Sequence, residues 1–451
     1  MDAETSDLAT RRPPARIGGV ALRPRSDPAL AGAAVGLALT LAVVLAAGVG
    51  AYLAFGPVVH GGFDPGGLVD HLGTRRDALA APFARWDSVW YLTIARDGYS
   101  PGAAPAFFPL YPLLVNLVGA LGPGLLAGGV LVSVGSLLVG LRLLWRLTEL
   151  EVGAAHPEAP LLAVLAVALG PMAFFLTAVY TESLYLALSV GAFLAARQGR
   201  WARAGALGAL AAATRSEGLL LIGALVLLFA DQHPGIPLRL RRPRAAAGAR
   251  AAVASGAAAP PPRPRRRDAA WILLVPAGLG AYVGWLWLIG LAPLSPFTAQ
   301  ADWFRHFTGP VEGLRQGAEA AWAGARQLLS GQDRTIYFAP AGGDPAIAAW
   351  HNLLPFAFLL GALAPLASAL RRLPLAYGAY AAAGLALALS YPVAPQPLAS
   401  LPRFLVVLFP LQMAVGVWLA RHPRLRVPVL GVGAAGLAAF TGLFATWHWV
   451  A

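Results

Sequence analysis

The segment from residue 85 to 112 combines acidic, basic and aromatic side chains directly after a predicted membrane span, in the order RWDSVWYLTIARDGYSPGAAPAFFPLYP. Asp87 lies between Trp86 and Trp90. Tryptophan collects at the membrane–water boundary because its ring is amphipathic. A carboxylate held there faces both a lipid-linked substrate and water, so Asp87 could act as a general base toward a hydroxyl group. Residues 86–97 also have the spacing of an interfacial amphipathic helix, and Asp87 could instead cap its first amides.

A second acidic position is Glu182, which follows Tyr180 and Thr181 at a predicted reversal of the chain after Gly170 and Pro171. An acid at the first turn of a helix is stabilised by the helix dipole, which would give Glu182 a purely structural role. The alternative is that Glu182 lines an external cavity and binds a sugar hydroxyl or an arginine.

Arg215 and Glu217 interrupt the apolar run 204–230. An ionisable residue inside a span costs several kcal/mol, so it normally faces a protein interior or a water-filled cavity. The two residues could form a structural pair with Glu182 or Asp87, or Arg215 could bind phosphate. Arg403 begins another apolar run and is the first candidate for a phosphate ligand, unless it only extends toward the interface.

Further polar residues gather in a predicted external loop, where Gln300 and Trp303 are candidate substrate contacts beside Arg305 and His306. The sequence contains no cysteine, which excludes disulfides and thiolate catalysis. It also lacks a two-histidine metal spacing, a Walker loop and a GxSxG elbow. We therefore expect neither a metal nor a cofactor.

The composition indicates in what kind of protein these residues occur. The chain has 451 residues, of which 58% are hydrophobic and 12% charged, whereas soluble domains carry roughly 25% charged residues. The net charge of +13 comes from arginine, since lysine is absent. The arginines concentrate in loops between apolar runs, which is the positive-inside pattern of membrane proteins and not a nucleic-acid surface.

Apolar runs long enough to form membrane helices recur along the chain, so we expect an all-α polytopic membrane protein with about 11 transmembrane helices. The arginine-rich loops place the N-terminus in the cytoplasm and the C-terminus outside. The runs lie near 30–55, 124–147, 160–180, 183–196, 204–230, 270–292, 351–370, 374–391, 403–420 and 427–449.

This orientation imposes two conditions. Segment 106–121 cannot cross the membrane, and we expect a re-entrant or interfacial helix there, after the first external loop. Run 204–230 must be two short helices that reverse near 214–218. The predicted organisation is a cytoplasmic tail and one transmembrane domain with two external regions and a disordered basic cytoplasmic linker. Their ranges are 1–28, 29–451, 56–123 with 293–350, and 232–269.

Several motifs resemble the mannosyltransferase II family of the GPI-anchor pathway and its bacterial relatives. The similarity covers about 85–220 well and the C-terminal half weakly. The motifs that carry it are Arg85-Trp86-Asp87-Ser88, Gly98-Tyr99, Phe107-Phe108-Pro109, Pro171-x-x-Phe174-Phe175, Tyr180-Thr181-Glu182-Ser183, Ala213-Thr214-Arg215-Ser216-Glu217-Gly218 and Pro402-Arg403-Phe404.

The resemblance implies the C-type glycosyltransferase superfold, in which a loop after the first span carries an essential acid. It further implies a polyprenyl-phosphate mannose donor, a lipid or glycan acceptor at the outer face of a bacterial plasma membrane, and inversion at the sugar. Asp87 would be the base, and Arg403 and then Arg215 would bind donor phosphate. The expected substrate contacts are Arg85, Trp86, Tyr180, Glu182, Glu217, Gln300 and Trp303.

Three alternatives stay open at this point. A transferase could use another polyprenyl-linked sugar, such as arabinose or glucose, because nothing in the sequence distinguishes a pyranose from a furanose. A lipid or sugar transporter would also explain the buried charges, although the paired broken helices of transporters are not evident. A structural subunit of a glycosylation complex would need no base. The resemblance also leaves room for a partner membrane subunit.

Overall fold

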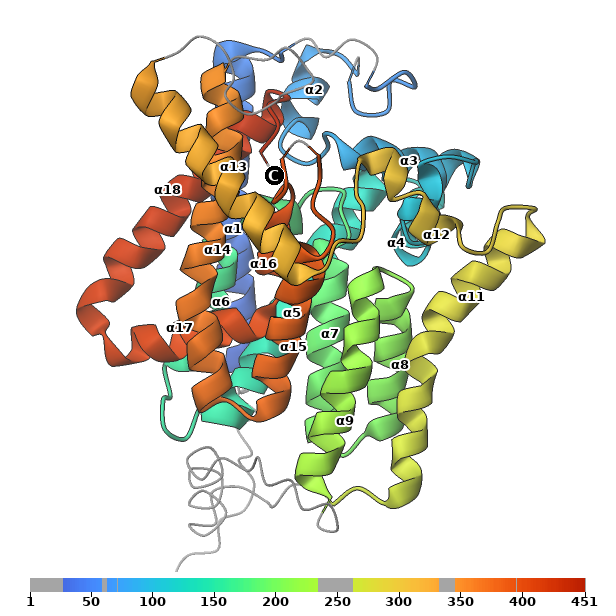
Figure 1. Ribbon diagram of the computed structural model, residues 1–451, viewed down its shortest axis with the longest axis vertical. Coiled ribbons are helices and arrows are strands. Elements are labelled where there is room, and N and C mark those ends of the chain that lie inside the picture. Colours follow the sequence, from blue (N-terminus) through green and yellow to red (C-terminus); the bar gives the residue numbers. More distant parts are fainter. Residues whose placement is uncertain are drawn as a thin grey trace, which may run out of the picture.

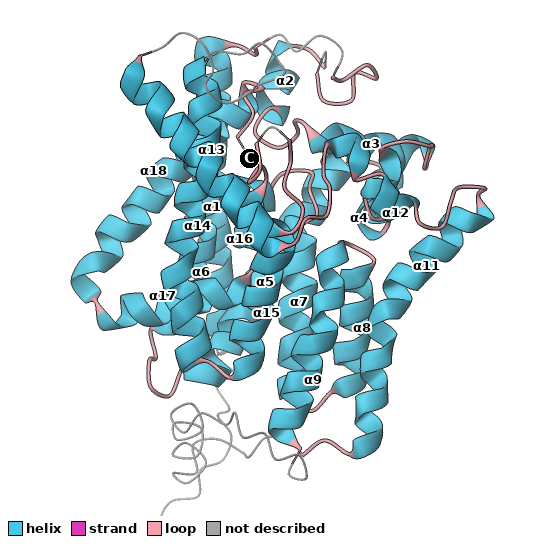
Figure 2. Ribbon diagram, in the orientation of Figure 1, coloured by secondary structure: helices cyan, strands magenta, loops and turns pink. Residues whose placement is uncertain are grey.

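The computed structural model describes residues 27–58, 63–70, 72–233, 263–331, 345–394 and 396–450. These ranges contain helices and loops and no strand, apart from one isolated bridge between Arg305 and Val393 (Figure 2). The predicted all-α class is confirmed. Residues 1–26 of the predicted tail and 234–262 of the predicted linker lie outside the described residues, whereas the last four linker residues, 266–269, begin the helical segment η4.

Five helical segments are long and apolar enough to cross a bilayer. A helix of 28 residues is about 42 Å long, which exceeds the roughly 30 Å hydrocarbon layer. The five are α1 (Pro28–Phe55), α5 (Leu125–Val152), η4 with α11 (Arg266–Leu288), α14 (Pro345–Arg372) and η6 with α18 (Pro423–Ala445). A multi-pass chain is therefore supported, whereas the number of 11 spans stays a prediction.

The remaining helices are shorter. They are α2 (Thr74–Ala80), α3 (Asp87–Asp97), η1 (Ala104–Ala106), α4 (Leu110–Ala120), α6 (Ala159–Ala168), η2 (Ala173–Leu176), α7 (Glu182–Arg197), α8 (Trp201–Ala212), η3 (Ser216–Leu219), α9 (Leu220–Gln232), α12 (Ser295–Thr298), η5 (Ala301–Trp303), α13 (Pro310–Ser330), α15 (Leu375–Leu389), α16 (Leu401–Val406) and α17 (Phe409–Arg421).

Helix α7 is the centre of the bundle. Every residue from Glu182 to Ala196 is buried, and the helix packs against α5, α8 and α9. A helix that is apolar on all sides is stable only in such a buried position. Its single carboxylate, Glu182, is its first residue, so the charge lies at the end of the helix and not along its apolar shaft.

Three predicted apolar runs are interrupted, and each interruption lies beside a charged residue. Run 160–180 is α6 followed by the buried irregular segment that leads to Glu182. Run 204–230 is divided into α8, η3 and α9 at Arg215, as the sequence predicted. Run 403–420 is divided into α16, which carries Arg403, and α17. Irregular backbone at membrane depth is tolerated when it is buried in protein.

The two ends of the bundle differ in character. The arginine-rich turns share one end, where Arg142 and Arg146 bind Asp27 and where Arg426 binds Glu158. Helices α2, α3, α4 and α12 gather at the other end, together with the C-terminus (Figure 1). The predicted basic loops thus lie on a common face, as the positive-inside pattern requires.

Helix α4 has 11 residues, or about 16 Å, and is too short to cross the hydrocarbon layer. This confirms the non-crossing helical segment expected within 106–121. Within the predicted external loop 293–350, residues Pro310–Ser330 form α13, a helix of 21 residues that packs against α14. Most of its buried residues are glycine and alanine, and Gly324 approaches the backbone of Ala349 in α14, which allows close contact without a strongly apolar sequence.

Helices α8 and α11 approach at their glycines, which gives a test of the packing. A Cβ at Gly278 would lie 1.8 Å from the carbonyl oxygen of Ala209, whereas a Cβ at Gly280 meets nothing within 4 Å. We expect Gly278→Ala to cost about 1–3 kcal/mol of stability through overpacking. Gly280→Ala should be neutral or stabilise by up to about 1 kcal/mol, because alanine favours helix. Thermal unfolding of both variants in detergent checks this, and equal midpoints would contradict the close approach.

Candidate functional site

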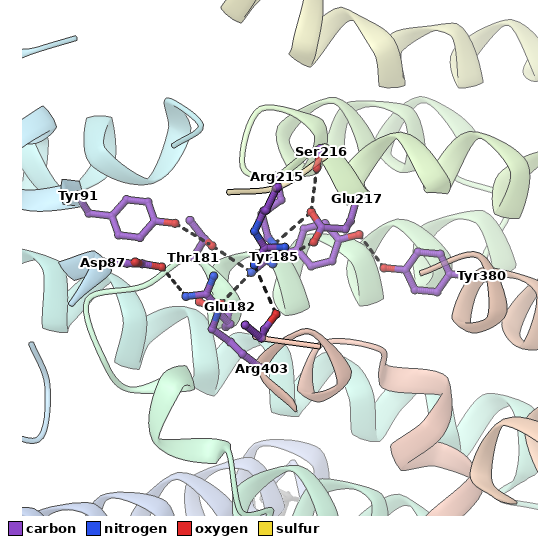
Figure 3. Close-up of polar contacts among 12 residues, drawn as sticks. Asp87, Tyr91, Thr181, Glu182, Tyr185, Arg215, Ser216, Glu217, Tyr380 and Arg403 are labelled. Atoms are coloured by element: carbon purple, nitrogen blue, oxygen red, sulfur yellow. Dashed lines mark hydrogen bonds and ion pairs between the residues drawn. The ribbon is translucent and has the colours of Figure 1, made fainter. Parts of the chain in front are cut away.

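Charged side chains of alternating sign form a continuous network at the N-terminal end of α7, where Glu182 lies (Figure 3). Asp87 Oδ2 accepts a hydrogen bond of 2.5 Å from Arg403 Nη1. Arg403 Nε lies 3.2 Å from Glu182 Oε1, and Arg215 Nη1 donates to the same oxygen over 2.8 Å. Arg215 Nη2 then donates to Glu217 Oε1 over 3.0 Å. The network joins α3, α16, α7 and η3.

Glu182 is the most deeply buried member, with 1% of its side chain exposed. A buried carboxylate requires compensation by cations and hydrogen bonds, and two arginines supply it here. The second oxygen, Oε2, is buried with no hydrogen-bond partner in the described part of the chain. Glu182 therefore both fixes the two guanidinium groups and keeps one acceptor site unused.

Asp87 differs from Glu182 in its exposure and in its bonding. Its side chain is 13% exposed, and it is the first residue of α3. The preceding Trp86 occupies the N-cap position, and no side chain caps the helix, so the alternative role of Asp87 as an amide cap is not adopted. Within the described chain the Oδ1 oxygen has no hydrogen-bond partner, while Oδ2 is held by Arg403. One carboxylate oxygen is fixed and the other is available.

Tyr180 holds the backbone around Asp87. Its hydroxyl donates to the Arg85 carbonyl over 3.1 Å and accepts from the Asp87 amide over 3.2 Å. The ring lies beside Arg403, whose guanidinium carbon is 5.4 Å from the ring centroid. Tyr180, predicted as a substrate contact, thus joins the loop before α3 to the start of α7 and is almost fully buried.

The side chain of Arg85 lies outside the charged network. It is fully buried and donates to the carbonyls of Val69, Ala84 and Ala445, with Asp70 at 3.3 Å. These bonds tie the segment before α3 to the end of α18. The structure therefore gives Arg85, predicted as a substrate contact, the environment of a residue that positions the loop.

Trp86 has a strained backbone, with φ 54° and ψ −117°. A positive φ is uncommon for a residue with a large side chain and persists where surrounding contacts enforce it. Here the indole ring packs edge-on against Phe63, Trp447 and Trp449, and Nε1 donates to the His448 carbonyl over 3.3 Å. The aromatic cluster thus fixes the direction in which the chain enters α3.

Trp303 lies near α3, the helix that begins with Asp87. Its ring centroid is 5.6 Å from that of Trp90 and 5.6 Å from that of Phe107. Its Nε1 is buried and has no hydrogen-bond partner among the described residues. Gln300 is partly buried, and its carbonyl accepts from the amides of Trp303 and Arg305.

Arg305 was not assigned a role from the sequence, although the structure brings it to the site. Its guanidinium carbon lies 5.6 Å from the centroid of Phe404, the residue after Arg403. The isolated bridge to Val393 holds the backbone there. The available signal was its position two residues after Trp303 in a segment predicted to be external.

No cluster of three histidine, aspartate or glutamate residues suited to a metal ion occurs within the described ranges. A cavity of about 720 Å³ lies apart from the charged network. It is lined by α5, α7 and α8 and ends at Arg142, Arg146, Arg200 and Arg203. We therefore base the site on the network and not on this cavity.

The fold and the site together define a class: a helical membrane protein that holds a partly exposed carboxylate and several arginines at one end of an apolar bundle. Residues 61–233 match the sequence profile of the mannosyltransferase (PIG-V) family. The resemblance predicted from the motifs is confirmed for this part of the chain. The matched part includes Asp87, Glu182, Arg215 and Glu217 and excludes Arg305 and Arg403.

Curated relatives agree with this match. The chain is 36% identical over 174 residues to GPI alpha-1,6-mannosyltransferase 2 of Rattus norvegicus, covering 36% of this chain and 34% of that protein. It is 34% identical over 171 residues to the Homo sapiens protein of the same name, covering 36% of this chain and 34% of the relative. The chain thus spans about a third of the length of these relatives.

Among solved structures, the oligosaccharyltransferase of Archaeoglobus fulgidus aligns over 94% of this chain and 55% of its own, with 12% identity and a TM-score of 0.42. A second structure of this archaeal enzyme, in complex with an inhibitory peptide and a dolichol-phosphate, gives the same TM-score. A likeness of this size assigns neither fold nor function.

The central position of Glu182 can be tested by removing its charge. Breaking a buried ion pair leaves an uncompensated charge and costs roughly 3–5 kcal/mol. We expect Glu182→Gln to lose stability on this scale, because Arg215 and Arg403 both depend on it. Glu319→Gln is the matched control, since Glu319 pairs with Arg315 on an exposed face of α13 and should change stability by less than about 1 kcal/mol. Comparable unfolding midpoints for the two variants would contradict the central role.

Proposed function

We propose that this protein is a membrane glycosyltransferase that moves mannose from polyprenyl-phosphate mannose to a hydroxyl of a lipid or glycan acceptor. The observation that carries the proposal is the Asp87 carboxylate, which is partly exposed, bound through one oxygen to Arg403 and open at the other. The similarity of residues 61–233 to mannosyltransferases supports the choice of sugar.

In this proposal Asp87 is the general base. Its Oδ1 takes the proton of the acceptor hydroxyl while that oxygen forms a bond to the anomeric carbon. The bond from the anomeric carbon to the phosphate oxygen breaks, and polyprenyl phosphate leaves from the opposite face with the electron pair. The sugar is inverted, and the proton ends on Asp87. A positioned base of this kind contributes about 10²- to 10⁴-fold in rate.

The neighbouring residues prepare Asp87 for this step. Arg403 holds Oδ2 through a charge-assisted hydrogen bond, which orients the free oxygen. Glu182 holds Arg403 in turn, and Arg215 and Glu217 complete the network. The charges of Arg403 and Arg215, the phosphate ligands expected from the sequence, are already compensated by these carboxylates.

The other expected substrate contacts divide into two groups. Arg85, Trp86 and Tyr180 support the backbone on either side of Asp87 through their hydrogen bonds and ring contacts. Trp303 offers a buried indole N–H without a described partner, and Gln300 lies three residues before it. We propose that Trp303 and Gln300 contact the substrate and that the first group positions the base.

Replacing Asp87 with asparagine should abolish transfer, with a loss of at least about 10²-fold, because asparagine cannot accept the proton. Asp97→Asn is the matched control, since Asp97 ends the same helix on the surface and should retain full activity. The assay measures transfer of labelled mannose from polyprenyl-phosphate mannose to membranes by the purified protein. Full activity of Asp87→Asn, with unchanged unfolding, would remove the assignment.

The same assay distinguishes the alternative functions. Label that appears in a new lipid or glycan indicates transfer, whereas donor that crosses a vesicle membrane unchanged indicates transport. If polyprenyl-linked arabinose or glucose is consumed and mannose is not, the transferase mechanism holds with a different sugar. Activity that appears only after another membrane protein is added identifies a partner subunit.

We further propose that the network faces the outside of a bacterial plasma membrane and the basic turns face the cytoplasm. The chain has no cysteine, so each introduced cysteine is the only thiol. Asp97→Cys and Arg203→Cys place it at exposed positions near opposite ends of the bundle. A membrane-impermeant maleimide should label Asp97→Cys in intact cells and Arg203→Cys only after permeabilisation. The reverse pattern would exclude an external reaction.

A further inference from the structure

Three guanidinium groups surround the ring of Phe404. Their central carbons lie 5.1 Å (Arg215), 5.6 Å (Arg305) and 5.4 Å (Arg403) from the ring centroid. Like charges this close repel one another unless anions lie between them. Which carboxylates contact each arginine therefore indicates whether the site can also bind an anionic ligand.

Two of the three arginines are already compensated by carboxylates. Arg403 contacts Asp87 and Glu182, and Arg215 contacts Glu182 and Glu217. Arg305 has no carboxylate within 4 Å in the described ranges. Its one described side-chain hydrogen bond runs from Nη2 to the Ala399 carbonyl and is 3.5 Å long. Most of the five N–H donors of this guanidinium are consequently unused.

The charge on Arg305 is nonetheless retained at neutral pH. Burial and the adjacent Arg403 lower the pKa of Arg305 to about 10, which still leaves the group protonated. Arg305 shares the Phe404 ring with two other guanidinium groups and has no acid of its own, so a bound anion would stabilise its charge. The direction of this pKa change agrees with the lack of a carboxylate partner.

The charge balance of the site indicates at which step of the proposed reaction the arginines bind an anion most strongly. Arg215, Arg305 and Arg403 lie near three carboxylates, those of Asp87, Glu182 and Glu217, but none of these carboxylates contacts Arg305. When Asp87 takes the acceptor proton, one negative charge leaves this balance. At the same moment the leaving phosphate gains negative charge, because it keeps the electron pair of the broken bond. The site becomes more positive as its ligand becomes more negative, which favours the transition state.

We propose that Arg305 binds the phosphate of the lipid-linked donor and of the polyprenyl-phosphate leaving group, while Arg403 positions the Asp87 base. This inference rests on the proposed function and moves to Arg305 the phosphate contact that was expected of Arg403 and Arg215. Trp303, two residues before Arg305, adds an indole N–H without a described partner and joins an aromatic wall with Trp90 and Phe107. Such a wall suits the apolar chain that follows the phosphate.

The test compares two ligands that differ only in phosphate. Binding of a polyprenyl phosphate and of the polyprenol of equal length is measured on the purified full chain. The unsubstituted protein should bind the phosphate more tightly. Arg305→Gln should lose roughly 10- to 100-fold of that preference, the range expected for charge-assisted contacts, with little change toward the alcohol. Arg305→Lys should retain part of it, since charge without the planar fork still attracts phosphate.

A matched control and the stability measurement separate binding from folding. Arg315→Gln removes another arginine of the same region, one paired with Glu312 and Glu319 on an exposed face, and should leave the preference unchanged. Without ligand, Arg305→Gln should unfold at the same temperature as the unsubstituted protein or higher, because it removes an uncompensated charge. If Arg305→Gln does not fold, the Arg305→Lys comparison decides.

Each outcome has a distinct meaning. A preference for phosphate that persists in Arg305→Gln overturns this inference and leaves the proposed function intact. A preference lost in Arg403→Gln but kept in Arg305→Gln returns the phosphate to Arg403. If the unsubstituted protein does not distinguish polyprenyl phosphate from polyprenol, both this inference and the proposed donor fail.

Discussion

The structure depends on the compensation of one buried carboxylate. Glu182 opens a helix that is buried along its whole length, and its charge is stabilised by arginines from two other parts of the chain. Charges in an apolar bundle are costly unless they are paired. Arg215 and Arg403 therefore have to meet Glu182, and this requirement brings together the break after α8, the beginning of α16 and the start of α7.

The interrupted helices follow from the same requirement. A continuous helix presents its side chains along its shaft, toward lipid or toward a neighbouring helix, whereas a break frees the chain to direct a charged group inward. The breaks next to Glu182, Arg215 and Arg403 provide this freedom and are buried in protein, where irregular backbone is tolerated. Asp87 joins from the short helix α3, so the network connects α3 with the centre of the bundle.

Much of the fold was predictable because its signals are local. The apolar runs gave the helices, the arginine-rich turns gave a common face, and parity required both a short helix near 106–121 and a reversal near 214–218. The interruptions of runs 160–180 and 403–420 and the helix α13 were not predicted, because hydropathy does not reveal where an apolar segment stops being helical. For the site, Asp87, Glu182, Arg215 and Arg403 were identified by their charge in apolar surroundings. The pairing of Arg215 with Glu182 was among the alternatives, whereas the contacts of Arg403 with Asp87 and Glu182 were not anticipated and Arg305 received no role.

The sequence by itself determined that the protein is a helical membrane protein, which charged residues lie within it, and which part resembles mannosyltransferases. The tertiary structure decided how those charges pair: Asp87 with Arg403, and Glu182 with two arginines, while Arg85 turns away toward backbone carbonyls. Hydropathy and loop charge are sums over neighbouring residues and can be read along the chain. Ion pairing depends on distances of a few ångströms between residues hundreds of positions apart, which only the packed bundle defines.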